Sequence, residues 1–138
     1  MALLFSNTVL AHVPLRDIRR LFTEAFRLLQ PDGLMVHFLN LSDHFAHADH
    51  SISPLNCLTF SEAECATYTT GFCSQNRRRV PSYRQLIEDA GFAVLQWDVS
   101  VQARLLQQWP HLNIHRDFAE LAPEELCATS LCVVARRP

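Results

Sequence analysis

Short apolar runs alternate along the chain with segments that have the period of an amphipathic helix. Residues 3–10 are apolar except for Ser6, Asn7 and Thr8, and such a short apolar run predicts a strand covered on both faces. Seven apolar residues between positions 18 and 29 recur at helical spacing, which predicts a helix that begins near Pro14. After the turn dipeptide Asp32-Gly33, residues 34–39 predict a second buried strand. A strand, a helix and a strand of these lengths predict a parallel, right-handed crossover.

The second half of the chain predicts further elements of both kinds. Pro81 and Ser82 indicate the start of a helix, with Ser82 and Gln85 as a capping box and Gly91 as the C-terminal cap. The remaining expected elements are a strand over 92–99, helices over 101–109 and 116–127, and a closing strand over 130–135. The pattern as a whole predicts one α/β domain over residues 1–138.

Residues 40–80 form a long connection between these elements, and connections of this length often carry function. We expect a short helix of its own from Ser61 to about Tyr68. His44, His47 and His50 are spaced by three, and together with Cys57 they suit zinc or iron. The alternative is a polar loop that faces solvent or a substrate.

Arg77, Arg78 and Arg79 end the same connection. A run of this kind is expected to be a solvated face. The alternative is a clamp for a carboxylate or phosphate, because arginine presents a planar fork of donors.

Composition narrows the class of protein. The chain has 138 residues, is 49% hydrophobic and carries a net charge of −2, so nothing favours a nucleic-acid partner. No apolar window reaches the length of a membrane span. The five cysteines are odd in number and form no CxxC pair, which favours reduced thiols. We therefore expect a cytoplasmic protein without a membrane partner.

Several segments resemble motifs of one family, in the order in which that family has them. Residues 9–13 read VLAHV, residues 27–33 read RLLQPDG, residues 87–92 read IEDAGF and residues 131–137 read LCVVARR. The loop adds NLSDHF at 40–45 and ISPL at 52–55. These segments resemble the C-terminal half of class I S-adenosylmethionine-dependent methyltransferases of the type 11-like group. Ala11 stands where that family often has Glu, and Asp32 replaces the first residue of its usual Gly pair.

The resemblance implies a partial Rossmann-like methyltransferase sheet, made of strands four to seven with flanking helices. The Gly-rich cofactor loop is missing, because none of the three glycines belongs to a G-x-G motif. The N-terminal cofactor half is therefore expected to be absent. The strand at residues 3–10 would then lie at an unpaired edge, where a second copy or a partner chain is expected to pair.

The resemblance also assigns roles to individual residues. Ser6, Asn7 and His12 are expected to contact S-adenosylmethionine, provided that the missing half is supplied. Asp43 and His44 are the expected catalytic residues, with His44 as a base near neutral pH. His37, inside the second apolar strand, is expected to be a buried histidine.

The function implied is methyl transfer to an unidentified small molecule, with little or no activity of the chain alone. One alternative is a non-enzymatic scaffold that descends from a methyltransferase. The other is a small metal-binding protein that uses the histidines of the long connection.

Overall fold

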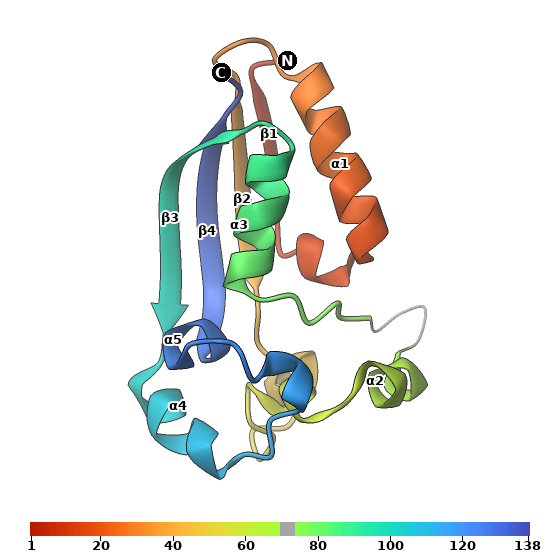
Figure 1. Cartoon of the computed structure of the whole chain (residues 1–138), viewed down its shortest axis with the longest axis vertical. Helices are drawn as coiled ribbons and strands as arrows, with labels where there is room; N and C mark the ends of the chain where they lie inside the picture. The colour runs from red at the N-terminus through yellow and green to blue at the C-terminus, as the bar shows by residue number, and fades with distance from the viewer. Residues whose placement is uncertain (70–73) are drawn as a thin grey trace.

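The computed structural model describes residues 1–69 and 74–138. Its strands and helices are drawn in Figure 1. In chain order the elements are β1 (Leu3–Asn7), η1 (Leu10–His12), α1 (Leu15–Leu28), β2 (Leu34–Asn40), η2 (His44–His47), η3 (Asn56–Thr59), α2 (Glu62–Tyr68), α3 (Val80–Asp89), β3 (Ala93–Val101), α4 (Ala103–Gln108), η4 (Trp109–His111), η5 (Arg116–Phe118), α5 (Pro123–Leu126) and β4 (Ala128–Arg136).

The four strands form one sheet in the order β1-β2-β4-β3. The strands β1 and β2 are parallel, with Leu3 opposite Leu34 and Asn7 opposite Phe38. The strand β4 runs antiparallel to both β2 and β3. The helices α1 and α3 lie side by side on one face of this sheet (Figure 1). The predicted α/β fold with a parallel crossover through the first helix is confirmed.

The helix α1 forms where the apolar stripe predicted it, and it buries that stripe. Pro14 precedes its first residue and Leu29 follows its last. Ile18, Phe22 and Ala25 face the sheet and are almost inaccessible to solvent. They belong to a core that continues through the inward residues of β2 and β4, among them Met35, Leu39, Leu131, Val133 and Ala135. Each of the larger side chains stabilises the fold by about 2 kcal/mol.

The opposite face of the sheet is bare in the part of the chain that the structure describes. Leu3, Phe5 and Phe38 lie on this face, with 54%, 65% and 49% of their surface exposed. The expectation that the first strand is covered on both faces is therefore wrong for this chain. Alternate residues of β1 are half-buried and the others are exposed, because it is an edge strand with helices on one side.

Two turns fix the ends of the helices. Asp32 has φ 62°, a conformation that Asp tolerates better than most residues. Gly91 has φ +94°, and a Cβ there would lie 3.1 Å from Phe26 Cε2, so this cap requires glycine. The predicted capping box at Ser82 is wrong, because α3 begins at Val80 and Arg79 is its N-cap residue. Pro81 suits the first turn of that helix.

A second hydrophobic cluster lies beyond the ends of β3 and β4. It is built from η3, α4 and α5, and its buried members are Leu55, Cys57, Leu58, Leu105, Leu126 and Cys127. The helices expected over 101–109 and 116–127 are shorter than predicted, since the first segment contains α4 and the second only η5 and α5. Pro110 follows the first predicted helix, and Pro123 is the first residue of α5. None of the described helices has both the length and the hydropathy needed to cross a bilayer.

Candidate functional site

The carboxyl ends of β1 and β2 bring two distant loops together. Because these strands are parallel neighbours, both loops leave the sheet at the same edge. The loop after β1 turns at Thr8, which has φ 55°, and carries His12 at the end of η1. The loop after β2 carries His44 at the start of η2. The two imidazole rings meet with their centroids 4.5 Å apart.

Hydrogen bonds hold the two histidines that neighbour His44, namely His12 and His47. Nδ1 of His12 lies 2.7 Å from the Ser74 carbonyl oxygen, and because a carbonyl only accepts, this nitrogen carries the proton. Nε2 of His47 lies 2.9 Å from the Asn40 amide nitrogen, Nδ2. His47 therefore accepts from Asn40 through Nε2. Both neighbours are thus held in defined orientations around His44.

The imidazole of His44 is partly buried and weakly basic. Burial lowers its pKa below the ordinary 6.5, and the nearby rings of His12 and His47 lower it further. The adjacent carboxylate of Asp43 acts in the opposite direction. At neutral pH the His44 ring is therefore mainly uncharged and is able to accept a proton.

Asp43 lies beside His44 and is only 3% exposed. Its Oδ1 accepts a hydrogen bond of 2.8 Å from the Phe45 amide and so caps η2. Its Oδ2 accepts from the Asn56 amide nitrogen at 3.1 Å. Both donors are uncharged. Within residues 1–69 and 74–138, no basic side chain lies within ion-pair distance of this carboxylate.

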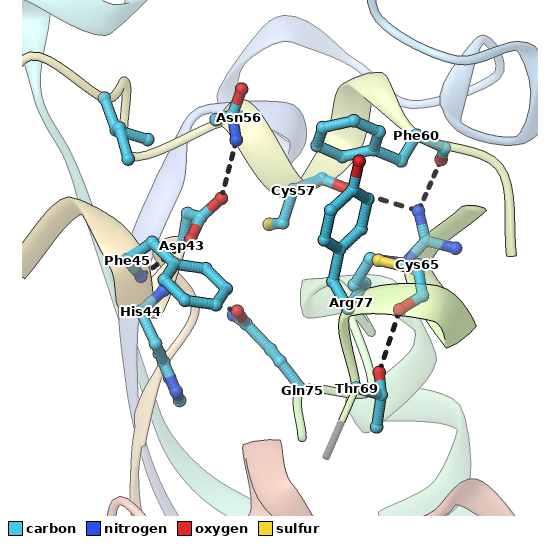
Figure 2. Close-up of a pocket in the computed structure, with 12 residues that line it drawn as sticks. Asp43, His44, Phe45, Asn56, Cys57, Phe60, Cys65, Thr69, Gln75 and Arg77 are labelled. Atoms are coloured by element: carbon cyan, nitrogen blue, oxygen red, sulfur yellow. Dashed lines mark hydrogen bonds between the residues drawn. The ribbon is translucent and has the colours of Figure 1, made fainter. Parts of the chain in front are cut away.

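A cavity of about 290 Å³ opens next to these two residues (Figure 2). Its walls come from η2, η3, α2 and the segment that precedes α3. Most of the walls are apolar, and the rings of Phe60 and Tyr68 contact each other with centroids 5.5 Å apart. The full lining is Asp43, His44, Phe45, Ile52, Asn56, Cys57, Phe60, Cys65, Tyr68, Thr69, Gln75 and Arg77.

A second hollow, of about 370 Å³, lies between η1 and α2 and includes His12. Four residues line both spaces, namely Cys65, Thr69, Gln75 and Arg77. The rings of His12 and His44 contact each other, and each belongs to a different one of the two spaces. A group bound at the end of β1 would therefore lie next to a molecule in the first cavity.

The arginine run is not a solvated face, and this prediction is wrong. Arg77 is 5% exposed and Arg79 is 3% exposed. Arg77 donates to the carbonyls of Phe60 and Cys57 and forms an ion pair with Glu62. Arg79 donates to the carbonyls of Leu41, Leu126 and Ala128. Both guanidinium groups are used by carbonyls that end strands and short helices, so neither is free to clamp an anion.

Ser6 and Asn7 point to opposite faces of β1, as neighbours on a strand do. Ser6 lies toward the helices, and its hydroxyl is 2.5 Å from Nδ1 of His37. Asn7 is exposed at the carboxyl end of the strand. Their roles in cofactor binding stay predictions, as does that of His12. His37 is 1% exposed, as expected, and burial lowers its pKa to about 4.

The described residues do not support the metal alternative. No group of three or more His, Cys, Asp or Glu side chains in residues 1–69 and 74–138 is arranged to hold a metal ion. His47 instead accepts from Asn40, and Cys57 is buried at the cavity wall. Burial raises the pKa of the Cys57 thiol to about 12, so it is a neutral wall residue. The described cysteines form no disulfide, and Cys73 lies outside the described residues.

Sequence reasoning missed two polar residues that join the loops of the site. Gln75 donates to the Ser42 carbonyl at 2.7 Å. Asn76 donates to the carbonyls of Leu10 and Val13 and so holds η1 in place. Neither residue belongs to a periodic pattern or a motif. The only signal available was their position at the end of a long connection.

Taken together, the strand order, the strand directions and the site at the carboxyl ends of β1 and β2 define a class I methyltransferase fold. An S-adenosylmethionine-dependent methyltransferase from Mesorhizobium loti superimposes on 99% of this chain with a TM-score of 0.58 and 17% identity. Phosphoethanolamine N-methyltransferase 2 from Haemonchus contortus, in complex with S-adenosyl-L-methionine, superimposes on 99% with a TM-score of 0.54 and 14% identity. The predicted fold class is confirmed.

The chain is shorter than these proteins. It spans 61% of the Mesorhizobium loti protein and 33% of the Haemonchus contortus protein. No family model and no curated protein matches the sequence.

Proposed function

We propose that this chain is the acceptor-binding part of an S-adenosylmethionine-dependent methyltransferase. The observation that carries the proposal is the contact between His12 and His44 at the carboxyl ends of β1 and β2, next to a largely apolar cavity. Ligands of open α/β sheets bind at this edge. Methyl transfer needs chiefly that donor and acceptor are positioned in line, and two adjoining spaces meet that need.

The residues at the end of β1 fit part of the cofactor. Asn7 and His12 are exposed polar side chains there, suited to the amino and carboxylate groups of the methionine portion. The described residues contain no glycine-rich turn that would let the backbone approach the adenosine. The rest of the cofactor site must therefore come from another polypeptide segment, and full activity is not expected of these residues alone.

The edge of β1 is the place for that segment. The strand β1 has a neighbour on one side only among the described strands. Beside it lies the bare face with Leu3, Phe5 and Phe38 exposed. An apolar edge strand of this kind favours pairing with another strand. We infer that the missing cofactor half, or a second copy of the chain, pairs here.

The chain's own residues would then carry out the acceptor side of the reaction. Bound S-adenosylmethionine supplies a methyl group on a sulfonium sulfur. The cavity holds the acceptor and excludes water from it. His44, being mainly uncharged at neutral pH, takes up the proton that the acceptor releases. His12 contacts His44 and orients its ring.

Calorimetric titration of S-adenosylhomocysteine tests the proposal. It is applied to this chain alone and to a fusion in which the N-terminal part of the Mesorhizobium loti enzyme precedes Met1. We expect the fusion to bind more tightly than about 100 μM, roughly −5.5 kcal/mol. Asn7→Ala and His12→Ala are expected to weaken binding, whereas Asn113→Ala, at an exposed site remote from β1, is the matched control.

Either of two results would overturn the proposal. One is a fusion that unfolds cooperatively, and is thus folded, but releases no heat with the ligand. The other is binding that Asn7→Ala and His12→Ala leave unchanged. Binding by the 138-residue chain alone would instead place the missing groups in a second copy, which sedimentation would detect as a dimer.

A further inference from the structure

The cavity beside Asp43 has a charge that nothing in the described structure balances. The carboxylate is almost fully buried, and both of its hydrogen bonds come from neutral amides. Burying a carboxylate without a cation is costly. Among the described residues, each carboxylate oxygen accepts one hydrogen bond and keeps lone-pair capacity for another. The site is therefore complementary to a bound cation.

The one arginine on the cavity wall does not neutralise Asp43. Arg77 directs its guanidinium to the Phe60 and Cys57 carbonyls, as Figure 2 shows. Its charge is matched by Glu62 at 2.9 Å, and its guanidinium also stacks on the ring of Phe118. The anion-binding capacity of this arginine is thus already used. A ligand with a carboxylate or phosphate would compete with Glu62 and with two carbonyls for Arg77, and it would meet the repulsion of Asp43.

The rest of the wall suits the body of an amine. Phe45, Phe60 and Tyr68 provide aromatic surface, and Ile52 adds an aliphatic side chain. Aromatic faces attract ammonium groups and also bury apolar carbon. A volume of about 290 Å³ is near the lower end of the range for small-molecule sites. The ligand is accordingly a small one.

We propose that this cavity binds a small amine whose cationic nitrogen pairs with Asp43 and whose apolar body lies against the aromatic wall. The claim that the amine is the methyl acceptor rests on the proposed function. The claim that the cavity binds an amine does not. In the transfer the ammonium ion first gives one proton to His44, and the neutral amine then attacks the methyl carbon with its lone pair. The N–C bond forms, the C–S bond breaks, and its electron pair stays on sulfur as a thioether. The product leaves as the methylated ammonium ion, so one proton is released overall.

The test uses three probes of similar shape and no cofactor: 3-phenylpropan-1-amine, 3-phenylpropan-1-ol and 3-phenylpropanoate. Binding to the ¹⁵N-labelled chain is followed by NMR. The Phe45 backbone amide and the Asn56 side-chain amide both donate to Asp43, so an amine at this carboxylate must shift both resonances. We expect the amine to bind about tenfold to hundredfold more tightly than the alcohol, and the carboxylate to bind most weakly.

Asp43→Asn removes the charge while it keeps an oxygen that can cap η2. It is expected to abolish the preference for the amine over the alcohol. The matched control is Asp49→Asn, because Asp49 also accepts from a backbone amide two residues ahead but is fully exposed and outside the cavity. The control is expected to bind the amine as the unaltered chain does.

The probe series on the unaltered chain decides the matter even if Asp43→Asn does not fold. Equal binding of amine and alcohol, tighter binding of the carboxylate, or shifts that bypass Phe45 and Asn56 would each overturn the proposal. Because no cofactor is present, these outcomes are independent of the S-adenosylhomocysteine titration. If the chain binds the amine but the fusion does not bind S-adenosylhomocysteine, the amine site stands and the proposed methyl transfer is refuted.

Discussion

The buried imidazole of His37 makes the stability of the chain depend on pH. His37 lies on β2 beneath α1, with its ring 5.7 Å from that of Phe22. Its Nδ1 is hydrogen-bonded to Ser6, and its Nε2 has no hydrogen-bond partner in residues 1–69 and 74–138. A protonated ring would need an acceptor at both nitrogens. Burial accordingly lowers its pKa from 6.5 to about 4.

The sign and size of the effect follow from this difference in pKa. In the unfolded chain the ring takes up a proton near its ordinary pKa of 6.5, whereas in the fold it stays neutral until about pH 4. The unfolded state therefore binds more protons in this window, and stability falls as the pH decreases through it. The full difference corresponds to about 3 kcal/mol. Between neutral pH and pH 4.5 the loss is about 2 kcal/mol.

Urea unfolding at pH 7 and pH 4.5, followed by tryptophan fluorescence, measures this loss. His37→Leu cannot titrate, so it is expected to lose about 2 kcal/mol less than the unaltered chain over the same interval. The lowered pKa of His44 contributes equally to both proteins and cancels in the comparison. His50→Leu, at an exposed histidine, is the control. Equal pH dependence of His37→Leu and the unaltered chain would refute the reasoning.

Three further substitutions test the packing and the bare face. Gly91→Ala should lower the free energy of unfolding by about 1–2 kcal/mol, because φ is +94° and Phe26 is close; thermal denaturation measures it. Arg79→Met should cost about 3 kcal/mol or more, because buried carbonyls lose their donor, whereas Arg84→Met at a partly exposed helix pair should cost less than about 1 kcal/mol. Phe5→Asp, on the bare face, should remove any self-association at high concentration in sedimentation and leave the circular dichroism spectrum unchanged.

Local periodicity was sufficient to predict the crossover unit. The spacing of apolar residues from Ile18 to Leu29, and the apolar run at 34–39, predict the helix and the strand without tertiary information. The contact between His12 and His44 was not predicted, because it depends on the conformations of the two loops that follow β1 and β2. The exposure of Phe5 could not be predicted from the sequence, because an apolar run has the same pattern whether or not a second layer covers it.

The environments of charged residues could not be predicted from the sequence as well as the helices and strands could. A run of three arginines looks solvated, since a cation is costly to bury. Arg79 is nevertheless buried because three carbonyl groups converge on it from Leu41, Leu126 and Ala128. Those carbonyls are brought together only by the tertiary fold. The same holds for Asp43, because its lack of a cationic partner among the described residues depends on how the loop packs and cannot be read from the sequence.

The cavity beside Asp43 and the bare face around Phe5 lie in different parts of the molecule, and we expect them to serve acceptor binding and cofactor binding respectively. The cavity beside Asp43 adjoins the second hydrophobic cluster, because Cys57 of η3 belongs to both. The bare face around Phe5 belongs to the other side of the sheet and takes no part in that cluster. Phe5→Asp is therefore expected to weaken cofactor binding by the fusion and to leave amine binding unchanged, whereas Asp43→Asn should do the reverse. If one substitution impaired both activities in a folded protein, the acceptor cavity would depend on the completed sheet, and the two binding steps would be coupled.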